Sequence, residues 1–86
     1  MFMIISLDYG DSSTVKLHLL TSNEDRASHA FDIIEARYKD INATLENGHK
    51  RLLELIRVPE EYEAGHVFFW GSHKHNGVTV LRTNNL

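Results

Sequence analysis

Cysteine is absent from the 86-residue sequence, and proline occurs once. The lack of cysteine excludes disulfide bonds, zinc or iron–sulfur sites with cysteine ligands, and a cysteine nucleophile. It is typical of proteins in a reducing environment, so we expect a cytoplasmic location. A chain of this length can build one hydrophobic core but not two. We therefore expect a single domain spanning residues 1–86.

The sequence is also poor in positive charge and in long apolar runs. Nine Lys and Arg residues against twelve Asp and Glu residues give a net charge of −3. This balance lacks the basic field of a protein that tracks a nucleic-acid backbone, so nucleic acid is not a favoured partner. The apolar start of the chain has no basic flank, and Asp8 interrupts it before it reaches the length of a signal peptide or a membrane span. We expect no membrane association.

The first twenty residues show the alternation of side chains that is typical of strands. Apolar residues recur at every second position through 3–9 and again through 15–20. The residues between them, Gly10-Asp11-Ser12-Ser13, favour a turn. The sequence therefore predicts an antiparallel hairpin.

A change of period after residue 21 predicts a helix. Thr21-Ser22-Asn23-Glu24 has the spacing of a capping box, with Thr21 or Ser22 as the N-cap residue. The apolar residues that follow are spaced three and four apart and form one stripe: Ala27, Ala30, Phe31, Ile34, Tyr38 and Ile41. We expect a helix of about five turns that buries this stripe.

The last third of the chain predicts further strands. Residues 50–58 suit either a short helix or a strand, and we choose a strand because the segment follows Asn47-Gly48 and ends before Pro59. Residues 67–70 and 78–81 are aromatic and β-branched runs that predict a second hairpin, followed by a frayed tail from residue 82.

The predicted fold class is α+β. The order of elements is strand, strand, helix, strand, strand, strand. We expect a two-layer sandwich in which one helix packs on one face of an antiparallel sheet of about five strands.

One helix covers only one face of a sheet, so the opposite face needs another cover. We assign to that face, as a predicted interface, Phe2, Ile4, His18, Leu20 and Leu81. An exposed apolar patch in a small protein is typical of an interaction site. A homodimer through this face or through a sheet edge is one interpretation, and a different partner or an apolar ligand is another. The third is that the strands curl or that the C-terminal hairpin covers this face, so that no apolar patch is exposed.

The segment from residue 66 to residue 82 contains aromatic and basic residues and no acid. We assign to it a ligand or partner surface made of Phe68, Trp70, His73, Lys74, His75 and Arg82. Aromatic side chains beside cations suit a nucleotide or another anionic small molecule. The alternative interpretation is a set of core aromatics with solvated loop histidines. We predict no metal ligands and no cofactor.

The motif Gly10-Asp11-Ser12 resembles the serine block of GDS-type (SGNH) esterases, which implies a nucleophile at Ser12. These enzymes also need an Asp-x-x-His pair, which the sequence lacks, and a much longer chain. A turn explains the three residues, and we predict no catalytic residues.

The favoured function is a small non-catalytic binding or interaction domain, acting as a homodimer or through a protein partner. A protein with which a virus or phage blocks or sequesters a host component is one setting for such a domain. The alternative is a protein that binds a nucleotide or another anionic metabolite. Nucleic-acid binding and a small hydrolase rank below both.

Overall fold

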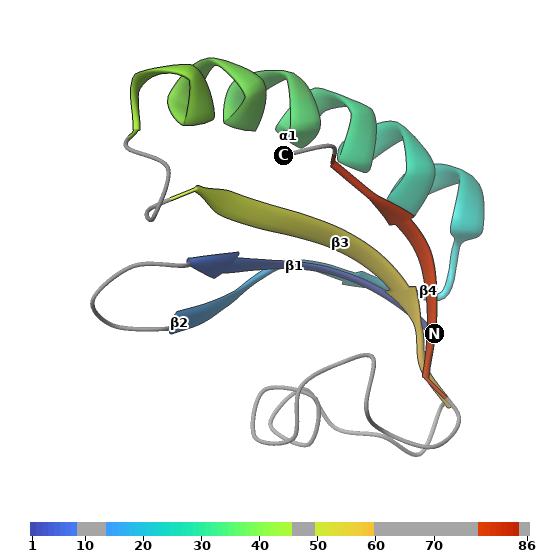
Figure 1. Cartoon of the computed structure of the whole chain (residues 1–86). Helices are drawn as coiled ribbons and strands as arrows, with labels where there is room; N and C mark the ends of the chain where they lie inside the picture. The colour runs from blue at the N-terminus through green and yellow to red at the C-terminus, as the bar shows by residue number, and fades with distance from the viewer. Residues whose placement is uncertain (9–13, 46–49, 60–77, 85–86) are drawn as a thin grey trace.

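A four-stranded antiparallel sheet with one helix across one face forms the body of the molecule in a computed structural model (Figure 1). The structure describes residues 1–8, 14–45, 50–59 and 78–84. Its elements in chain order are strand β1 (Phe2–Asp8), strand β2 (Thr14–Thr21), helix α1 (Glu24–Thr44), strand β3 (Arg51–Arg57) and strand β4 (Thr79–Thr83). Their order in the sheet is β2-β1-β3-β4, so β1 and β3 are central.

The predicted α+β fold with one helix on an antiparallel sheet is confirmed. The strand chosen for residues 50–58 is present as β3. The described residues contain four strands rather than about five, because the strand expected at residues 67–70 lies outside them. In the part of the chain that the structure describes, no helix has the length and apolarity needed to cross a membrane.

The N-cap of helix α1 lies one residue after Ser22 and two after Thr21, the two predicted caps. Asn23 is the N-cap residue, and its side-chain oxygen accepts a hydrogen bond from the backbone N–H of Arg26. Thr21, one of the predicted caps, instead accepts a hydrogen bond from the backbone N–H of Asn23. Both Thr and Asn can cap a helix, so the pattern alone did not fix the position. The predicted apolar stripe is confirmed along its whole length, with three members buried and three half-buried in the core beneath the helix: Ala27, Phe31 and Tyr38, and Ala30, Ile34 and Ile41.

The first hydrophobic core lies between α1 and the sheet. Its buried members are Ile4, Ala27, Phe31, Tyr38, Leu53 and Leu55. Half-buried apolar residues pack against it: Phe2, Leu19, Ala30, Ile34, Ile41 and Leu81. These contacts attach the helix to strands β1, β2 and β3.

This core corrects the predicted placement of the interface residues. Phe2, Ile4 and Leu81 lie beneath the helix instead of on the opposite face, and His18 contacts the helix residue Tyr38. Both sets of alternating residues in β1 contain apolar residues, Phe2 and Ile4 in one and Met3 and Ile5 in the other, so alternation did not show which set meets the helix. A bulge between β1 and β2 then places His18 and Leu20 on different faces, because Leu20 pairs with Met3.

The opposite face of the sheet holds a second hydrophobic cluster. Met3, Ile5, Ile56 and Val58 are 0–2% exposed and pack against one another and against half-buried neighbours. The centre of this face is therefore closed to solvent in the single chain. Leu20, at 44% exposure, is the predicted interface residue that remains open to solvent.

Candidate functional site

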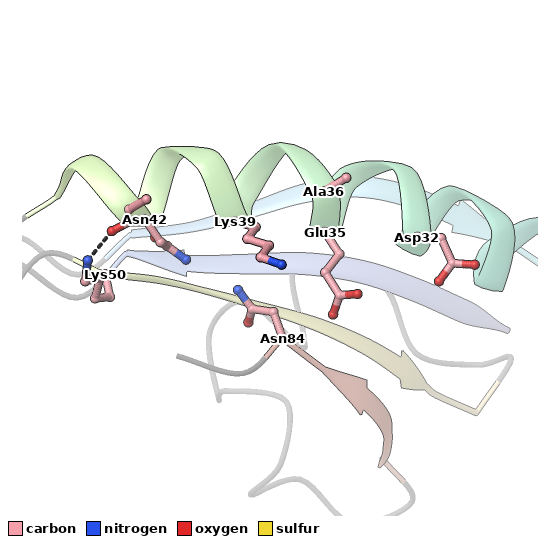
Figure 2. Close-up of a pocket in the computed structure, with 8 residues that line it drawn as sticks. Asp32, Glu35, Ala36, Lys39, Asn42, Lys50 and Asn84 are labelled. Atoms are coloured by element: carbon pink, nitrogen blue, oxygen red, sulfur yellow. Dashed lines mark hydrogen bonds between the residues drawn. The ribbon is translucent and has the colours of Figure 1, made fainter.

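A groove of about 570 Å³ runs between the second half of α1 and the end of β4 (Figure 2). Most of its lining residues are of polar or charged types and they carry both signs of charge: Asp32, Glu35, Ala36, Lys39, Asn42, Ala43, Lys50 and Asn84. Its volume falls in the range of about 300–1,000 Å³ that is common for ligand sites. The groove is therefore the candidate functional site of the described chain.

The groove exists because β4 is shorter than its neighbour β3. Strand β4 pairs with β3 only from Glu54 to Arg57. The first part of β3, Arg51–Leu53, thus has no β4 residue in register beside it. This step in the sheet lies alongside the C-terminal half of α1, where the helix supplies the other wall (Figure 2).

Two asparagine side chains form hydrogen bonds with backbone groups of β3 at this step. Asn84 accepts a hydrogen bond from the Leu53 N–H at 2.7 Å and donates one to the Arg51 carbonyl at 3.1 Å. Asn42 accepts from the Arg51 N–H at 2.8 Å and donates to the same carbonyl at 3.0 Å. Both side chains imitate the hydrogen bonds of a neighbouring strand, so they block addition of a strand from another chain at this point.

Lys50 closes the groove at the C-terminal end of the helix. The last turn of α1 contains no basic residue. The Lys50 amine instead donates hydrogen bonds to the carbonyls of Asn42 and, at 2.8 Å, Leu45. The Asn42 carbonyl also accepts the Leu45 N–H, so the cation adds a second hydrogen bond there, and it opposes the negative end of the helix dipole.

The charged side chains of the wall differ in how they are partnered. Asp32 forms an ion pair with Arg82, with 2.6 Å between the carboxylate and guanidinium atoms. Among the described residues, Glu35 and Lys39 have no hydrogen-bond or ion-pair partner. Both side chains extend from α1 toward the space beside Asn84 (Figure 2). These two opposite charges are available to a binding partner.

Arg82, predicted from the sequence to lie in a frayed tail, is part of β4 and contacts the helix, while its part in a ligand surface stays a prediction. Besides its ion pair with Asp32, it donates hydrogen bonds to the backbone and side-chain oxygens of Ser28 at 3.3 and 3.2 Å. Its guanidinium lies 4.4 Å from the ring centroid of Phe31, a cation–π distance. These contacts give Arg82 a structural role. The rest of the predicted ligand surface lies outside the described residues: Phe68, Trp70, His73, Lys74 and His75.

A second polar cluster joins the sheet to the helix away from the groove. His18 Nε2 is hydrogen-bonded to the Ser6 hydroxyl and to the Tyr38 hydroxyl, each at 3.0 Å. The rings of His18 and Tyr38 meet edge to face, with centroids 5.6 Å apart. Burial, and secondarily the charge of Lys16, lowers the pKa of His18 below its ordinary value of 6.5. Ser6 and Tyr38 are buried, so the cluster works as a bridge between the layers.

Sequence reasoning did not identify the groove residues as a site. The spacing of Asp32, Glu35 and Lys39, three and then four residues, places them on one side of the helix and was the available signal. Asn84 carried no such signal, because its role depends on where β4 ends. The predicted turn at Gly10-Asp11-Ser12 lies outside the described residues. Within the described residues, no group of three His, Asp or Glu side chains is placed to hold a metal ion.

Fold and groove together define a small α+β domain with a groove at the junction of its two layers that carries charges of both signs. Protein-family models, curated protein sequences and solved structures provide no significant match to the chain.

Proposed function

We propose that the protein is a small non-catalytic binding domain that works through protein–protein contact, either as a homodimer or with a different protein, in the cytoplasm. The observation that carries the proposal is the groove, in which Glu35 and Lys39 have no partner among the described residues. Folding therefore leaves two opposite charges side by side at the edge of a cavity of about 570 Å³.

The signs of these charges favour a protein over a small anion. An anionic metabolite near Lys39 would also meet the carboxylate of Glu35 in the same groove. A protein surface can present a negative and a positive group together and match both. Asn42 and Asn84 are hydrogen-bonded to the backbone of β3, so a protein that binds in the groove would contact side chains rather than this backbone.

The first test is the mass of the protein in solution, measured by sedimentation from about 1 µM to about 1 mM, the range of weak to moderate complexes. A homodimer gives a mass that rises with concentration. If the mass stays that of a monomer, the second test is a pull-down that compares the natural chain with a Glu35→Ala/Lys39→Ala variant. A protein bound by the natural chain and lost from the variant supports the proposal.

The proposal is wrong if the chain is monomeric throughout and the two baits retain the same proteins. A thermal-shift screen against nucleotides separates the remaining alternative, because a ligand that binds the folded state raises its stability by RT ln(1 + [L]/Kd). A clear shift with a nucleotide, unchanged in the Glu35→Ala/Lys39→Ala variant, would favour a small-ligand site elsewhere in the chain.

A further inference from the structure

We propose that a second copy of this chain docks on the strip formed by Glu35, Ala36 and Lys39, with the two α1 helices antiparallel. In this arrangement Glu35 of each copy pairs with Lys39 of the other. The inference rests on the homodimer form of the proposed function and assigns its interface to one face of the helix.

The strip is complementary to itself under a two-fold axis. Residues four apart on a helix lie on the same side, with about 5–6 Å between their Cβ atoms. A two-fold axis that passes between Glu35 and Lys39, perpendicular to the helix, reverses the chain direction and brings each acid opposite a base. A two-fold dimer uses the same patch on both copies, so the patch must match itself in this way. Parallel helices in register would place like charges together.

The neighbours of the two charges suit a close approach of helices. Ala36 is exposed and lies next to Lys39 around the helix, on the side away from Glu35, and the exposed Ala43 follows two turns later on the same side as Ala36. Packed helices have axes about 8–10 Å apart, with the closest approaches where side chains are short. Asp32 is already paired with Arg82 and so does not compete for the partner's lysine.

Other surfaces of the described chain are less suited to a second copy. Strand β2 is one edge of the sheet, and it carries a bulge and the exposed Lys16, two features that oppose pairing with another strand. Strand β4 is the other edge; it is short and bulged, and Asn84 occupies the backbone of β3 beyond its end. The centre of the second sheet face is already buried.

Charge reversal tests the inference, with the dimer dissociation constant measured by sedimentation equilibrium. Glu35→Lys alone places two lysines against two lysines, and Lys39→Glu alone places two acids against two acids. We expect each variant to dissociate at least about tenfold more readily than the natural chain, the scale of losing charge complementarity. An equimolar mixture of the two variants should form a heterodimer, and the double variant Glu35→Lys/Lys39→Glu should recover the homodimer.

Arg37→Glu is the matched control, because residue 37 is exposed and projects from roughly the opposite side of the helix. It should leave the dissociation constant unchanged, and circular dichroism should confirm that every variant is folded. This interface is wrong, although the homodimer stands, if both single charge reversals leave the dissociation constant unchanged. The same holds if the mixture of the two variants associates no more tightly than either variant alone. A natural chain that is monomeric at every concentration overturns the interface and the homodimer together.

Discussion

At the scale of single residues, His18 links the two layers of the fold. A bulge in β2 turns its ring toward the helix, where Nε2 meets the hydroxyls of Ser6 and Tyr38. A neutral imidazole can accept a hydrogen bond from a hydroxyl at Nε2, whereas the protonated ring can only donate there. Burial first, and the charge of Lys16 second, lower the pKa of His18. The neutral ring is thus the form that fits the folded chain.

The lowered pKa predicts a loss of stability in acid. When His18 has a lower pKa folded than unfolded, the unfolded chain binds more protons, and the free energy of unfolding falls as the pH falls. The contribution is complete above the ordinary pKa of 6.5 and is lost as the pH drops from there through the folded pKa. We expect urea denaturation at a series of pH values to show a steeper fall below pH 6.5 for the natural chain than for His18→Gln.

The difference between the natural chain and His18→Gln reports on His18 alone, because the other five histidines and all carboxyl groups are present in both proteins. Parallel curves for the natural chain and the variant would show that His18 does not titrate differently on unfolding. Lys16→Gln offers a second check: it removes the lesser cause and should flatten the fall only in part.

At the scale of elements, the spacing of apolar residues predicted which elements form, but the sequence did not predict where these elements begin and end. Apolar spacing predicted the helix and its buried stripe, since a 3.6-residue period is hard to obtain by accident over five turns. The helix ends depend on local hydrogen bonds that several residues can supply, so the cap was placed wrongly and Asn23 has the role expected of Thr21 or Ser22. The end of β4 was also misjudged. Residues 82–84 appeared to be a tail, yet Arg82 and Asn84 fasten this strand to its neighbours.

The role of Asn84 at the end of β4 gives an element-scale prediction. Replacing Asn84 with Ala removes the acceptor for the buried Leu53 N–H, while the Arg51 carbonyl keeps Asn42 as a donor. A buried donor without a partner costs about 1–3 kcal/mol, so we expect the free energy of unfolding to fall by that amount. Hydrogen exchange should show faster exchange of the Leu53 amide in particular.

Thr83→Ala is the control for this substitution, because Thr83 is the neighbouring residue and is exposed. It should change stability by no more than about 0.5 kcal/mol, as is usual for surface positions. If the Leu53 amide exchanges as slowly in Asn84→Ala as in the natural chain, the hydrogen bonds of the Asn84 side chain do not stabilise this edge of β3.

At the scale of the whole molecule, a single sheet separates two hydrophobic clusters. Neighbouring residues of β1 such as Ile4 and Ile5 belong to different clusters, which is why both alternating sets in that strand contain apolar residues. The sequence predicted that both faces are apolar, but which set the helix covers depends on bulges and on pairing between distant strands. The groove was unpredictable for the same reason, since it forms only where β4 stops short of β3 and the helix passes above.

The two clusters make a prediction about the second face. Ile56 is fully buried there, on the side of the sheet away from the helix. If that face is a core in the single chain, Ile56→Ala should lower the free energy of unfolding by about 2–5 kcal/mol, as truncation in a close-packed interior does. Leu53→Ala, in the cluster beneath the helix, should cost a similar amount. Ile33→Ala is the matched control, because Ile33 is 48% exposed and its truncation leaves no cavity.

Urea denaturation followed by circular dichroism measures all three substitutions, at a protein concentration below any dimer dissociation constant. A single transition is expected in each case, because β1 and β3 contribute buried residues to both clusters and neither can unfold alone. If Ile56→Ala instead cost no more than Ile33→Ala, the second face would be solvated in the monomer. An interface on the sheet would then replace the helix strip as the place where a second chain binds.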